Sequence, residues 1–276
     1  MTSPWNAGAP PIHAQIGVSG FTRAILRGVP LFLLVFGGLL LLLLVRLFER
    51  PVYGLRRPYT PYITQFVCKS AFVILGMGFS RKGVPMTGAG AVVANHSSWL
   101  DIFALNASKR IYFVSKAEVA AWPGIGWLAR ATGTVFIKRD RNKARQHIDV
   151  FKDRLAAGHK LLFFPEGTST DGQLVLAFKP TLFAAFFDPV LIDRMRVQPV
   201  TVRYEAPQGA DPRFYGWWGD MDFGPHLLAT LAAPRQGRVT VIYHQPVKLT
   251  DFADRKHLAL ALETTVRSGL AHRSDQ

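Results

Sequence analysis

The sequence of 276 residues contains one cysteine, Cys68, so an internal disulfide and a cysteine-ligated metal cluster are both excluded. It contains no H-E-x-x-H pair and no glycine-rich phosphate loop of the G-x-x-x-x-G-K-[ST] type. A G-x-S-x-G turn, which would present a nucleophilic serine, is also missing. These absences favour a protein that uses no metal, no P-loop and no acyl-enzyme on such a serine.

Acidic residues are scarce, because 18 Asp and Glu stand against 33 Lys and Arg, which gives a net charge of +15. Such a balance needs an acidic partner, which can be a nucleic acid, anionic lipid head groups or an anionic substrate. The basic residues are scattered, and no zinc-finger or basic-zipper spacing is present. We therefore expect no nucleic acid and favour membrane lipids as partners.

One long apolar run, Val29–Val45, carries no charge and is flanked by Arg27 and Arg46. It is close to the roughly 20 residues that cross a bilayer. A signal peptide is a rival interpretation, but the run starts late, and arginines instead of a small-residue cleavage site follow it. A helix lying in the plane of the membrane is a second rival, because Pro30 and the pair Gly37-Gly38 weaken a span.

The residues around this run suggest a division of the chain. We expect a mobile tail at 1–25, an anchor with an interfacial helix at 26–80, and a catalytic domain at 81–276. The interfacial helix is predicted at 65–79, which is too short to span, and a core helix is the alternative for it. Basic residues after the apolar run outnumber those before it, which predicts a catalytic domain that faces the cytoplasm.

From residue 90 onward, short apolar runs alternate with helical patterns. This alternation predicts an α/β fold with a mixed, partly parallel sheet flanked by helices, next to the N-terminal membrane-anchoring helix. The predicted strands are 91–94, 111–114, 134–137, 161–164, 198–204 and 238–243. The predicted helices are 100–106, 144–157, 179–187 and 255–267.

His96 and Asp101 form the first candidate site. His96 comes at the end of the predicted strand 91–94, and Asp101 follows five residues later across one tight turn. This spacing lets the carboxylate hold one ring nitrogen and leave the other free to take a proton from an alcohol. The alternative is a polar turn in which Asp101 or Ser98 caps a helix.

Three further blocks follow the N-H-x-x-x-x-D turn, namely G-T-V-F-I-K-R at 133–139, F-P-E-G-T at 164–168 and V-Q-P-V at 197–200. In order and spacing the four blocks resemble the motifs of the glycerolipid acyltransferase family, which includes lysophosphatidate and lyso-ornithine lipid acyltransferases. The resemblance covers roughly residues 65 to 250. It implies transfer of an acyl group from a thioester to a membrane lipid, with His96 as the base and Asp101 as its orienting partner.

The resemblance also assigns substrate-binding residues. It implies that Glu166, with Gly167 and Thr168, helps to position the acceptor, and that Arg139 binds an anion. The alternatives are a carboxylate at a helix N-terminus for Glu166 and a solvated basic loop for Arg139. Family members commonly have an arginine after the threonine, associated with the acceptor phosphate, whereas this sequence has Ser169. A neutral hydroxyl there removes a charge-assisted contact with phosphate.

The sequence therefore predicts an O-acyltransferase that completes a two-chain lipid. The donor is an acyl carrier protein thioester or an acyl-coenzyme A thioester, used as a co-substrate, and no bound cofactor is expected. Two acceptors are open, lysophosphatidate and a lyso-aminolipid such as lyso-ornithine lipid. The rival functions are a non-catalytic lipid-binding membrane protein and a thioesterase. A tryptophan-rich stretch at 217–226 is an anchor at the membrane interface, the wall of a head-group pocket, or a loop packed on the sheet.

Overall fold

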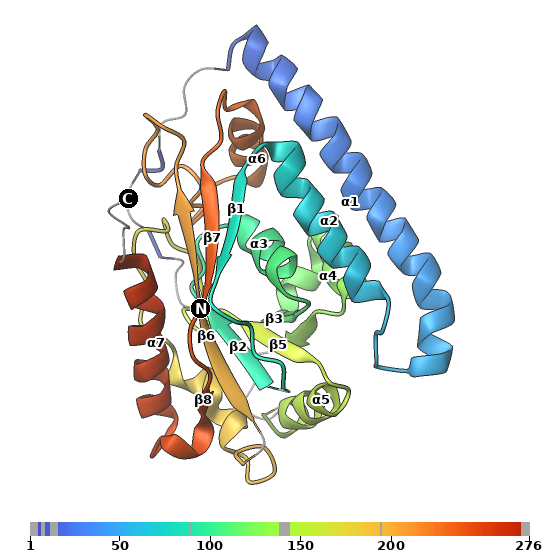
Figure 1. Cartoon of the computed structure of the whole chain (residues 1–276), viewed down its shortest axis with the longest axis vertical. Coiled ribbons are helices and arrows are strands. Elements are labelled where there is room, and N and C mark those ends of the chain that lie inside the picture. Colours follow the sequence, from blue (N-terminus) through green and yellow to red (C-terminus); the bar gives the residue numbers. More distant parts are fainter. Residues whose placement is uncertain are drawn as a thin grey trace.

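The protein folds around one mixed sheet, seen in Figure 1 of the computed structural model. The structure describes residues 5–6, 9–11, 16–88, 90–137, 144–193 and 195–271. The strand order is β1-β7-β6-β2-β5-β3-β4, and β8 pairs with β6 outside this order. The strands are β1 (Gly78–Lys82), β2 (Gly90–Ala94), β3 (Tyr112–Lys116), β4 (Val135–Ile137), β5 (Lys160–Phe163), β6 (Arg196–Glu205), β7 (Arg238–Tyr243) and β8 (Val247–Lys248).

Most of the sheet is parallel. Strands β4, β3, β5, β2 and β6 all run in one direction, and β7 is antiparallel to β6. The carboxyl ends of the parallel strands therefore meet at one edge, where open α/β sheets bind ligands. The predicted mixed, partly parallel sheet is confirmed, and its six predicted strands are present. Strand β1 was not predicted, because it contains polar residues in place of an apolar run.

The sheet separates two apolar layers, and β2 contributes to both. Val92 and Ala94 pack in the layer that contains α2, α3 and α6, whereas Ala91 and Val93 pack in the layer that contains α5, η3 and α7. The bounds are α2 (Thr60–Leu75), α3 (Leu100–Ser108), α5 (Ala144–Ala156), the 3-10 helix η3 (Pro180–Phe187), α6 (Phe223–Ala232) and α7 (Arg255–Ala271).

The predicted helix at 179–187 is a 3-10 helix and not an α-helix. Its tighter winding puts side chains three residues apart on one side, and Phe183 and Phe186 are both buried there. In the described part of the chain, the α-helices that were not predicted are α4 (Ile125–Thr132) and α6, and the short 3-10 helices η1 (Ala117–Ala121) and η4 (Leu249–Asp251) were not predicted either. Helix α6 begins with Phe-Gly-Pro, a sequence that suggests a turn although proline is well tolerated in a first helical turn.

Helix α1 (Val18–Tyr53) is continuous over 36 residues, and Pro30 does not interrupt it. It begins at Val18, so the predicted tail at 1–25 is too long. Residues 18–25 are helical because they pack against α6, where Ala24 is buried and Arg23 Nε donates to the carbonyl oxygen of Ala232 at 2.8 Å. The predicted boundary between the anchor and the catalytic domain, at residue 80, falls within β1. This strand pairs with β7, so all of it belongs to the sheet.

Both ends of α1 are bonded to the rest of the protein. Near its start, Arg27 Nη1 donates to the carbonyl oxygens of Leu231 and Ala233 at 2.8 and 2.7 Å. Near its end, the buried Glu49 accepts hydrogen bonds from the N–H groups of Tyr59 and Thr60 at 2.8 and 3.1 Å. Helix α1 therefore packs on α6 near its start and runs beside α2 on the outside of the molecule, as Figure 1 shows.

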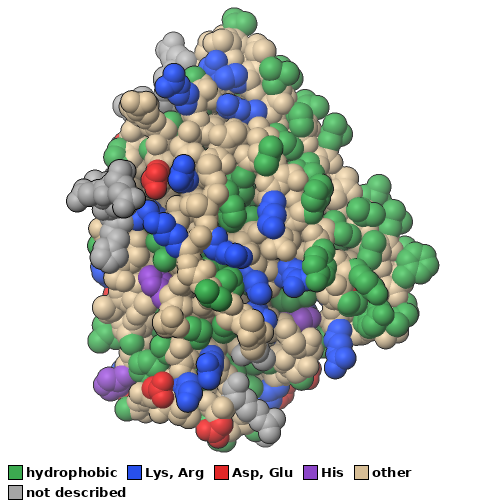
Figure 2. Space-filling view, in the orientation of Figure 1, with side chains coloured by type: hydrophobic (Ala, Val, Ile, Leu, Met, Phe, Trp, Pro, Cys, Tyr) green, Lys and Arg blue, Asp and Glu red, His purple; other side chains and the backbone are tan. Residues whose placement is uncertain are grey.

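The outer face of α1 is apolar and exposed. It is the one helix in the described part of the chain that is long and apolar enough to cross a membrane. Figure 2 shows hydrophobic side chains gathered along the edge of the molecule that α1 and α2 occupy. The exposed members include Leu40, Leu44, Leu47, Phe48, Tyr62 and Phe66.

Helix α2 lies between α1 and α3, and it begins five residues before the predicted interfacial helix at 65–79. It ends at Leu75, followed by Gly76, whose φ of +70° is in the left-handed region, and residues 78–79 already belong to β1. Cys68 and Phe72 on its inner face are buried, whereas Tyr62 and Phe66 are exposed. The buried face of this helix agrees with the core interpretation, and the exposed apolar face is the one that the interfacial interpretation concerns.

Candidate active site

His96 lies two residues after the end of β2, and Asp101 holds its imidazole. The Nδ1 atom of His96 lies 2.8 Å from Oδ2 of Asp101. The same oxygen accepts hydrogen bonds from the backbone N–H groups of Ser97 at 2.7 Å and Ser98 at 3.0 Å. A carboxylate that receives these amide donors acts as an acceptor, so Nδ1 carries the proton and Nε2 keeps its lone pair. The predicted pair therefore has the geometry of a general base and its orienting partner.

The turn that carries this pair also starts a helix. Asp101 lies in the first turn of α3, and Oγ of Ser98 accepts a hydrogen bond from the N–H of Leu100 at 3.3 Å. The N-cap residue of α3 is Trp99, however, and it makes no side-chain cap hydrogen bond, so neither Asp101 nor Ser98 occupies the cap position that the alternative predicted. The His96 side chain is 22% exposed, whereas the Asp101 side chain is fully buried. The imidazole therefore reaches solvent while the group that orients it does not.

Tyr204 is a third member of the site that the sequence did not predict. Its hydroxyl donates a 2.7 Å hydrogen bond to Oδ1 of Asp101, from the carboxyl end of β6. Burial, together with the Asp101 carboxylate, holds the pKa of Tyr204 well above its usual range, so the hydroxyl keeps its proton. One available signal was a tyrosine at the end of a predicted strand, on the edge where such sheets bind ligands.

Phe164 supports the imidazole from one side. The two rings are stacked, with centroids 4.1 Å apart and planes 12° from parallel. Behind His96, Thr170 donates its N–H to the His96 carbonyl oxygen at 2.9 Å. The F-P-E-G-T block thus packs directly on the histidine, although the two blocks lie about seventy residues apart in sequence.

Glu166 is buried behind His96, with 1% of its surface exposed. Its Oε1 accepts the N–H of His96 at 2.7 Å, and its Oε2 accepts the N–H of Leu176 at 2.7 Å. Burial raises the pKa of Glu166 to about 8, although these two hydrogen bonds act in the opposite direction. Both oxygens are thus occupied by backbone donors, and the contact of Glu166 with the acceptor stays a prediction.

The rest of the F-P-E-G-T block lies in a partly exposed loop. Gly167 has a φ of +75°, a conformation that favours glycine, and its N–H bonds to the carbonyl oxygen of Phe164 at 3.1 Å. Thr168 and Ser169 are partly exposed, whereas Asp171 is buried and its Oδ1 accepts the N–H of Gln173 at 2.9 Å. The predicted substrate-binding residue Arg139 lies outside the described residues.

The tryptophan-rich stretch packs against the sheet domain, as one of its three interpretations predicted. Trp218 is buried, and the N–H of Trp217 donates to the carbonyl oxygen of Ser97 at 2.8 Å. Further along, the buried His226 accepts a 3.0 Å hydrogen bond from Nε1 of Trp99. This stretch therefore supports the turn that carries His96 from behind.

Comparison with known proteins assigns the family. The profile described as Acyltransferase matches residues 80–203, which contain all four motif blocks. The chain is 55% identical to the lyso-ornithine lipid O-acyltransferase of Rhodobacter capsulatus over 99% of this chain and 100% of that protein. It is 36% identical to the lyso-ornithine lipid O-acyltransferase of Brucella abortus, over 71% of this chain and 75% of that protein.

The chain belongs to the acyltransferase family. This acyltransferase also resembles the 1-acyl-sn-glycerol-3-phosphate acyltransferase of Neisseria gonorrhoeae, with 29% identity over 73% of this chain and 77% of that protein. Its fold matches the crystal structure of the 1-acyl-sn-glycerophosphate acyltransferase PlsC from Thermotoga maritima, with a TM-score of 0.65 and 21% identity. That match covers 94% of this chain and 99% of the other.

The acyltransferase transfers acyl groups to lyso-lipids. This agrees with the function predicted from the four motif blocks and disagrees with the two rivals, a non-catalytic lipid-binding protein and a thioesterase. Its anchoring to the membrane through the N-terminal apolar helix is also consistent with the predicted location.

Proposed function

We propose that this acyltransferase acylates the hydroxyl of lyso-ornithine lipid. The observation that carries the proposal is the 55% identity, over essentially the whole chain, with a protein of that activity. The sequence supports it at Ser169, where a phosphate-binding arginine would be expected in an enzyme for lysophosphatidate. Lysophosphatidate remains the second candidate acceptor, because relatives with 29% identity use a 1-acyl-glycerol phosphate.

In the proposed reaction, His96 acts as the general base. Its Nε2 takes the proton of the acceptor hydroxyl, and the oxygen attacks the carbonyl carbon of the acyl thioester, so that a C–O bond forms. The tetrahedral intermediate then collapses with cleavage of the C–S bond, and the imidazolium returns the proton to the leaving thiolate. The Asp101 carboxylate, 2.8 Å from Nδ1, stabilises the positive charge on the ring during the transfer.

We propose that the thioester donor is carried by acyl carrier protein or by coenzyme A. Neither donor requires a metal or a resident cofactor, because a thioester is already activated toward an alcohol. Direct transfer between two bound substrates fits the absence of a G-x-S-x-G serine from the sequence. The site therefore contributes a base and orientation, and holding both substrates in place supplies much of the rate.

We propose that α1 anchors the enzyme in the plane of the membrane, with the catalytic domain in the cytoplasm. Arg27 and Glu49 lie 22 residues apart, so α1 rises about 33 Å between them, close to the thickness of the hydrocarbon core. Arg27 nevertheless bonds to α6, and the turn that follows α1 bonds to α4 of the same domain, where Arg57 Nη1 donates to the carbonyl oxygen of Ala131 at 2.7 Å. A perpendicular span would separate these contacts across the bilayer. The exposed Trp127 on α4, 61% accessible, suits the same interface.

The test of the acceptor uses the purified full-length enzyme in detergent. Initial rates are measured with lyso-ornithine lipid and with lysophosphatidate, each with the same acyl carrier protein thioester and then with the coenzyme A thioester. We expect kcat/KM for lyso-ornithine lipid to exceed that for lysophosphatidate by at least tenfold. A higher value for lysophosphatidate with both donors contradicts the proposed acceptor. An Asp101→Asn variant shows the rate that remains without the oriented base.

A further inference from the structure

Two exposed tryptophans lie on the segment that follows β3. Trp122 is 44% exposed and Trp127 is 61% exposed, and Pro123 beside Trp122 is exposed as well. The two rings belong to residues 117–128, which comprise η1, the turn at 122–124 and the first turn of α4, and which we call the tryptophan corner. Large aromatic rings usually pack in a core or at an interface, so two exposed indoles within six residues indicate a contact surface.

The tryptophan corner is held in one shape by its own backbone. A Cβ atom at Gly126 would overlap the carbonyl oxygen of Ala120, so only glycine allows α4 to begin this close to η1. The N–H of Gly126 donates to the carbonyl oxygen of Trp122 at 2.8 Å, and Nη1 of Arg130 donates to that of Ala120. A fixed turn therefore carries the two indoles, and binding a partner through them orders little additional backbone.

The tryptophan corner adjoins the apolar surface of the anchor. Helix α4 contacts both α1 and α2, and Figure 1 shows it on the side of the sheet that these two helices cover. The end of α4 is bonded to the turn after α1, where Arg57 Nη1 donates to the carbonyl oxygen of Ala131 at 2.7 Å. On the neighbouring α2, Tyr62 and Phe66 are exposed. The exposed aromatic surface thus continues from α2 onto the corner.

The same corner begins at the catalytic edge of the sheet. Val92 of β2 and Phe113 of β3 both pair with Leu162 of β5, so residue 117 is level with His96. Two strand spacings of about 4.8 Å separate their strands, roughly 10 Å in all. A row of stacked rings crosses this distance, because Phe164 stacks on His96 at 4.1 Å between centroids and on Phe113 at 6.0 Å. A lipid surface that touches the corner is therefore close to the base.

We propose that the tryptophan corner is a second membrane-contact element, which inserts Trp122 and Trp127 among the lipid head groups and holds His96 near the membrane surface. The proposal rests on the in-plane anchor proposed above and extends it. An indole favours the head-group level because it joins a large apolar ring to a polar N–H. Residues 117–128 contain Glu118 and no Lys or Arg, so their charge does not favour an acidic protein as the partner.

The second contact has a mechanical role. A single helix in the plane of the membrane leaves the catalytic domain free to rotate about the helix axis. Contact of the corner beside α1 removes this rotation and turns the carboxyl edge of the sheet toward the lipid. The hydroxyl of a lyso-lipid lies near the head groups, so this orientation brings it within reach of His96 and favours the productive geometry.

The first experiment locates the tryptophan corner relative to the membrane. Trp122→Cys and Trp127→Cys are labelled with NBD, a fluorophore whose emission shifts to the blue in an apolar environment, and are bound to vesicles of phosphatidylethanolamine and phosphatidylglycerol. Burial raises the pKa of the native Cys68 to about 12, so this thiol stays unlabelled at neutral pH. We expect a blue shift at both positions, with quenching by lipids that carry a nitroxide near the head group.

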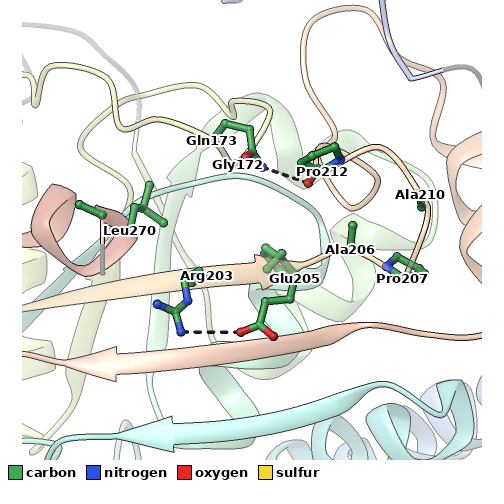
Figure 3. A pocket seen from close by; sticks show the side chains of 11 residues that line it. Gly172, Gln173, Arg203, Glu205, Ala206, Pro207, Ala210, Pro212 and Leu270 are labelled. Atoms are coloured by element: carbon green, nitrogen blue, oxygen red, sulfur yellow. Dashed lines mark hydrogen bonds and ion pairs between the residues drawn. The ribbon is translucent and has the colours of Figure 1, made fainter. Parts of the chain in front are cut away.

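The control position lies on the other side of the sheet. Leu260 is 62% exposed on α7, which packs in the layer opposite to α2. Further along α7, Leu270 lines a pocket at the carboxyl end of β6 (Figure 3). We expect Leu260→Cys, labelled in the same way, to show the emission of a probe in water and no quenching.

The second experiment compares rates in two lipid environments. The double variant Trp122→Gln with Trp127→Gln, the control Leu260→Gln and the wild type are assayed with the acceptor in vesicles and in detergent micelles, with one thioester donor. We expect the ratio of kcat/KM in vesicles to that in micelles to fall about tenfold in the double variant, because the apolar area that docks the catalytic edge is lost. The ratio stays at the wild-type value in the control.

Four results overturn the proposal. Water-like emission at positions 122 and 127, in a protein that sediments with the vesicles, leaves the α1 anchor in place and rejects the corner. A shift that appears only after addition of acyl carrier protein assigns the corner to the donor. An equal loss of rate in vesicles and micelles assigns the tryptophans to the reaction itself. A wild type that does not sediment with the vesicles contradicts the proposed anchor and this extension together.

Discussion

The hydroxyl of Tyr204 donates to Oδ1 of Asp101 at 2.7 Å, the carboxylate oxygen that His96 does not use. Asp101 therefore receives donors on both oxygens, and its plane is fixed relative to the imidazole. We infer that Tyr204 is a positioning residue, which acts on the reaction through Asp101 and His96 without touching the substrates.

Replacing Tyr204 with phenylalanine tests this role. Without the hydrogen bond from Tyr204, the Asp101 carboxylate stabilises the protonated form of His96 more strongly. The acidic limb of the kcat/KM profile therefore moves to higher pH. We also expect kcat to fall about tenfold, because a lost charge-assisted bond is worth roughly 1.5–3 kcal/mol and only part of it bears on the transition state. The matched control is Tyr62→Phe, an exposed tyrosine on α2. A lower kcat with an unmoved acidic limb indicates a structural role alone.

Removal of the base has a larger effect. We expect His96→Ala to lower kcat by 10²–10⁴-fold while the protein still reaches the membrane, since a positioned general base typically contributes that factor. Asp101→Asn is also severe, because an amide disturbs the tautomer of the ring and the support of its charge. Thermal denaturation of each variant separates a lost base from a lost fold. Retention by His96→Ala of more than about a tenth of the wild-type rate contradicts the assignment.

Glu166 makes stability depend on pH in a direction unusual for a carboxyl group. Its pKa is about 8 in the folded protein against an ordinary value of 4.5. Between these values the folded state keeps a proton that the unfolded state releases. The contribution of Glu166 to the free energy of unfolding is therefore greatest below pH 4.5. It falls as pH rises toward 8, by up to about 1.4 kcal/mol per pH unit.

The measurement is the midpoint of unfolding in detergent at several values of pH between 4.5 and 8. In Glu166→Gln this component of the slope disappears, because the amide does not titrate in this range. The variant is also less stable at low pH, since one of the two backbone donors loses its acceptor. An identical pH slope in wild type and variant shows that Glu166 is ionised throughout the range.

Residues close in sequence were easier to predict than residues close only in the fold. His96 and Asp101 are joined by one tight turn, so their spacing alone predicts that they meet. Tyr204 reaches Asp101 because β6 pairs with β2, and this pairing of distant segments is not readable from either strand. Glu166 shows the same limit, because the motif predicted that it matters, whereas the fold shows its bonds to His96 and Leu176.

The anchor was predicted from composition, but its packing was not. An apolar run of this length indicates contact with lipid. It does not indicate that Gly38 would pack against Val67, or that Arg27 would bond to α6. Those contacts depend on where α2 and α6 lie once the sheet has formed, which is a property of the whole chain.

Deletion of residues 1–50 therefore does more than release the enzyme from lipid. We expect the truncated protein to have a melting temperature several degrees lower and to aggregate when detergent is removed. Leu31 and Leu42 of α1 are buried against the rest of the protein, and their deletion exposes the apolar surface that covered them. Deletion of residues 1–15 serves as the control, since α1 begins at Val18. Sedimentation with liposomes and thermal denaturation provide the two measurements. A monodisperse truncated protein with an unchanged melting temperature contradicts this expectation.

A substitution at Ser169 tests which acceptor the enzyme prefers. We expect Ser169→Arg to raise kcat/KM for lysophosphatidate relative to lyso-ornithine lipid about tenfold, which corresponds to about 1.4 kcal/mol and is within reach of one charge-assisted contact. Ser169 is partly exposed, so the longer side chain has room. Ser169→Gln, of similar length without the charge, is the control. An unchanged ratio in the arginine variant shows that position 169 does not read the head group.

The two bonded ends of α1 have a consequence for the lipids themselves. Because Arg27 on α1 and Arg57 just after α1 both bond to the catalytic domain, the proposed anchor keeps the enzyme on one side of the bilayer. The acceptor is then drawn from the cytoplasmic leaflet, and the finished two-chain lipid is returned to that leaflet. Synthesis by this enzyme therefore creates an asymmetry between the leaflets, and a separate flippase must move the product if the outer leaflet is to receive it.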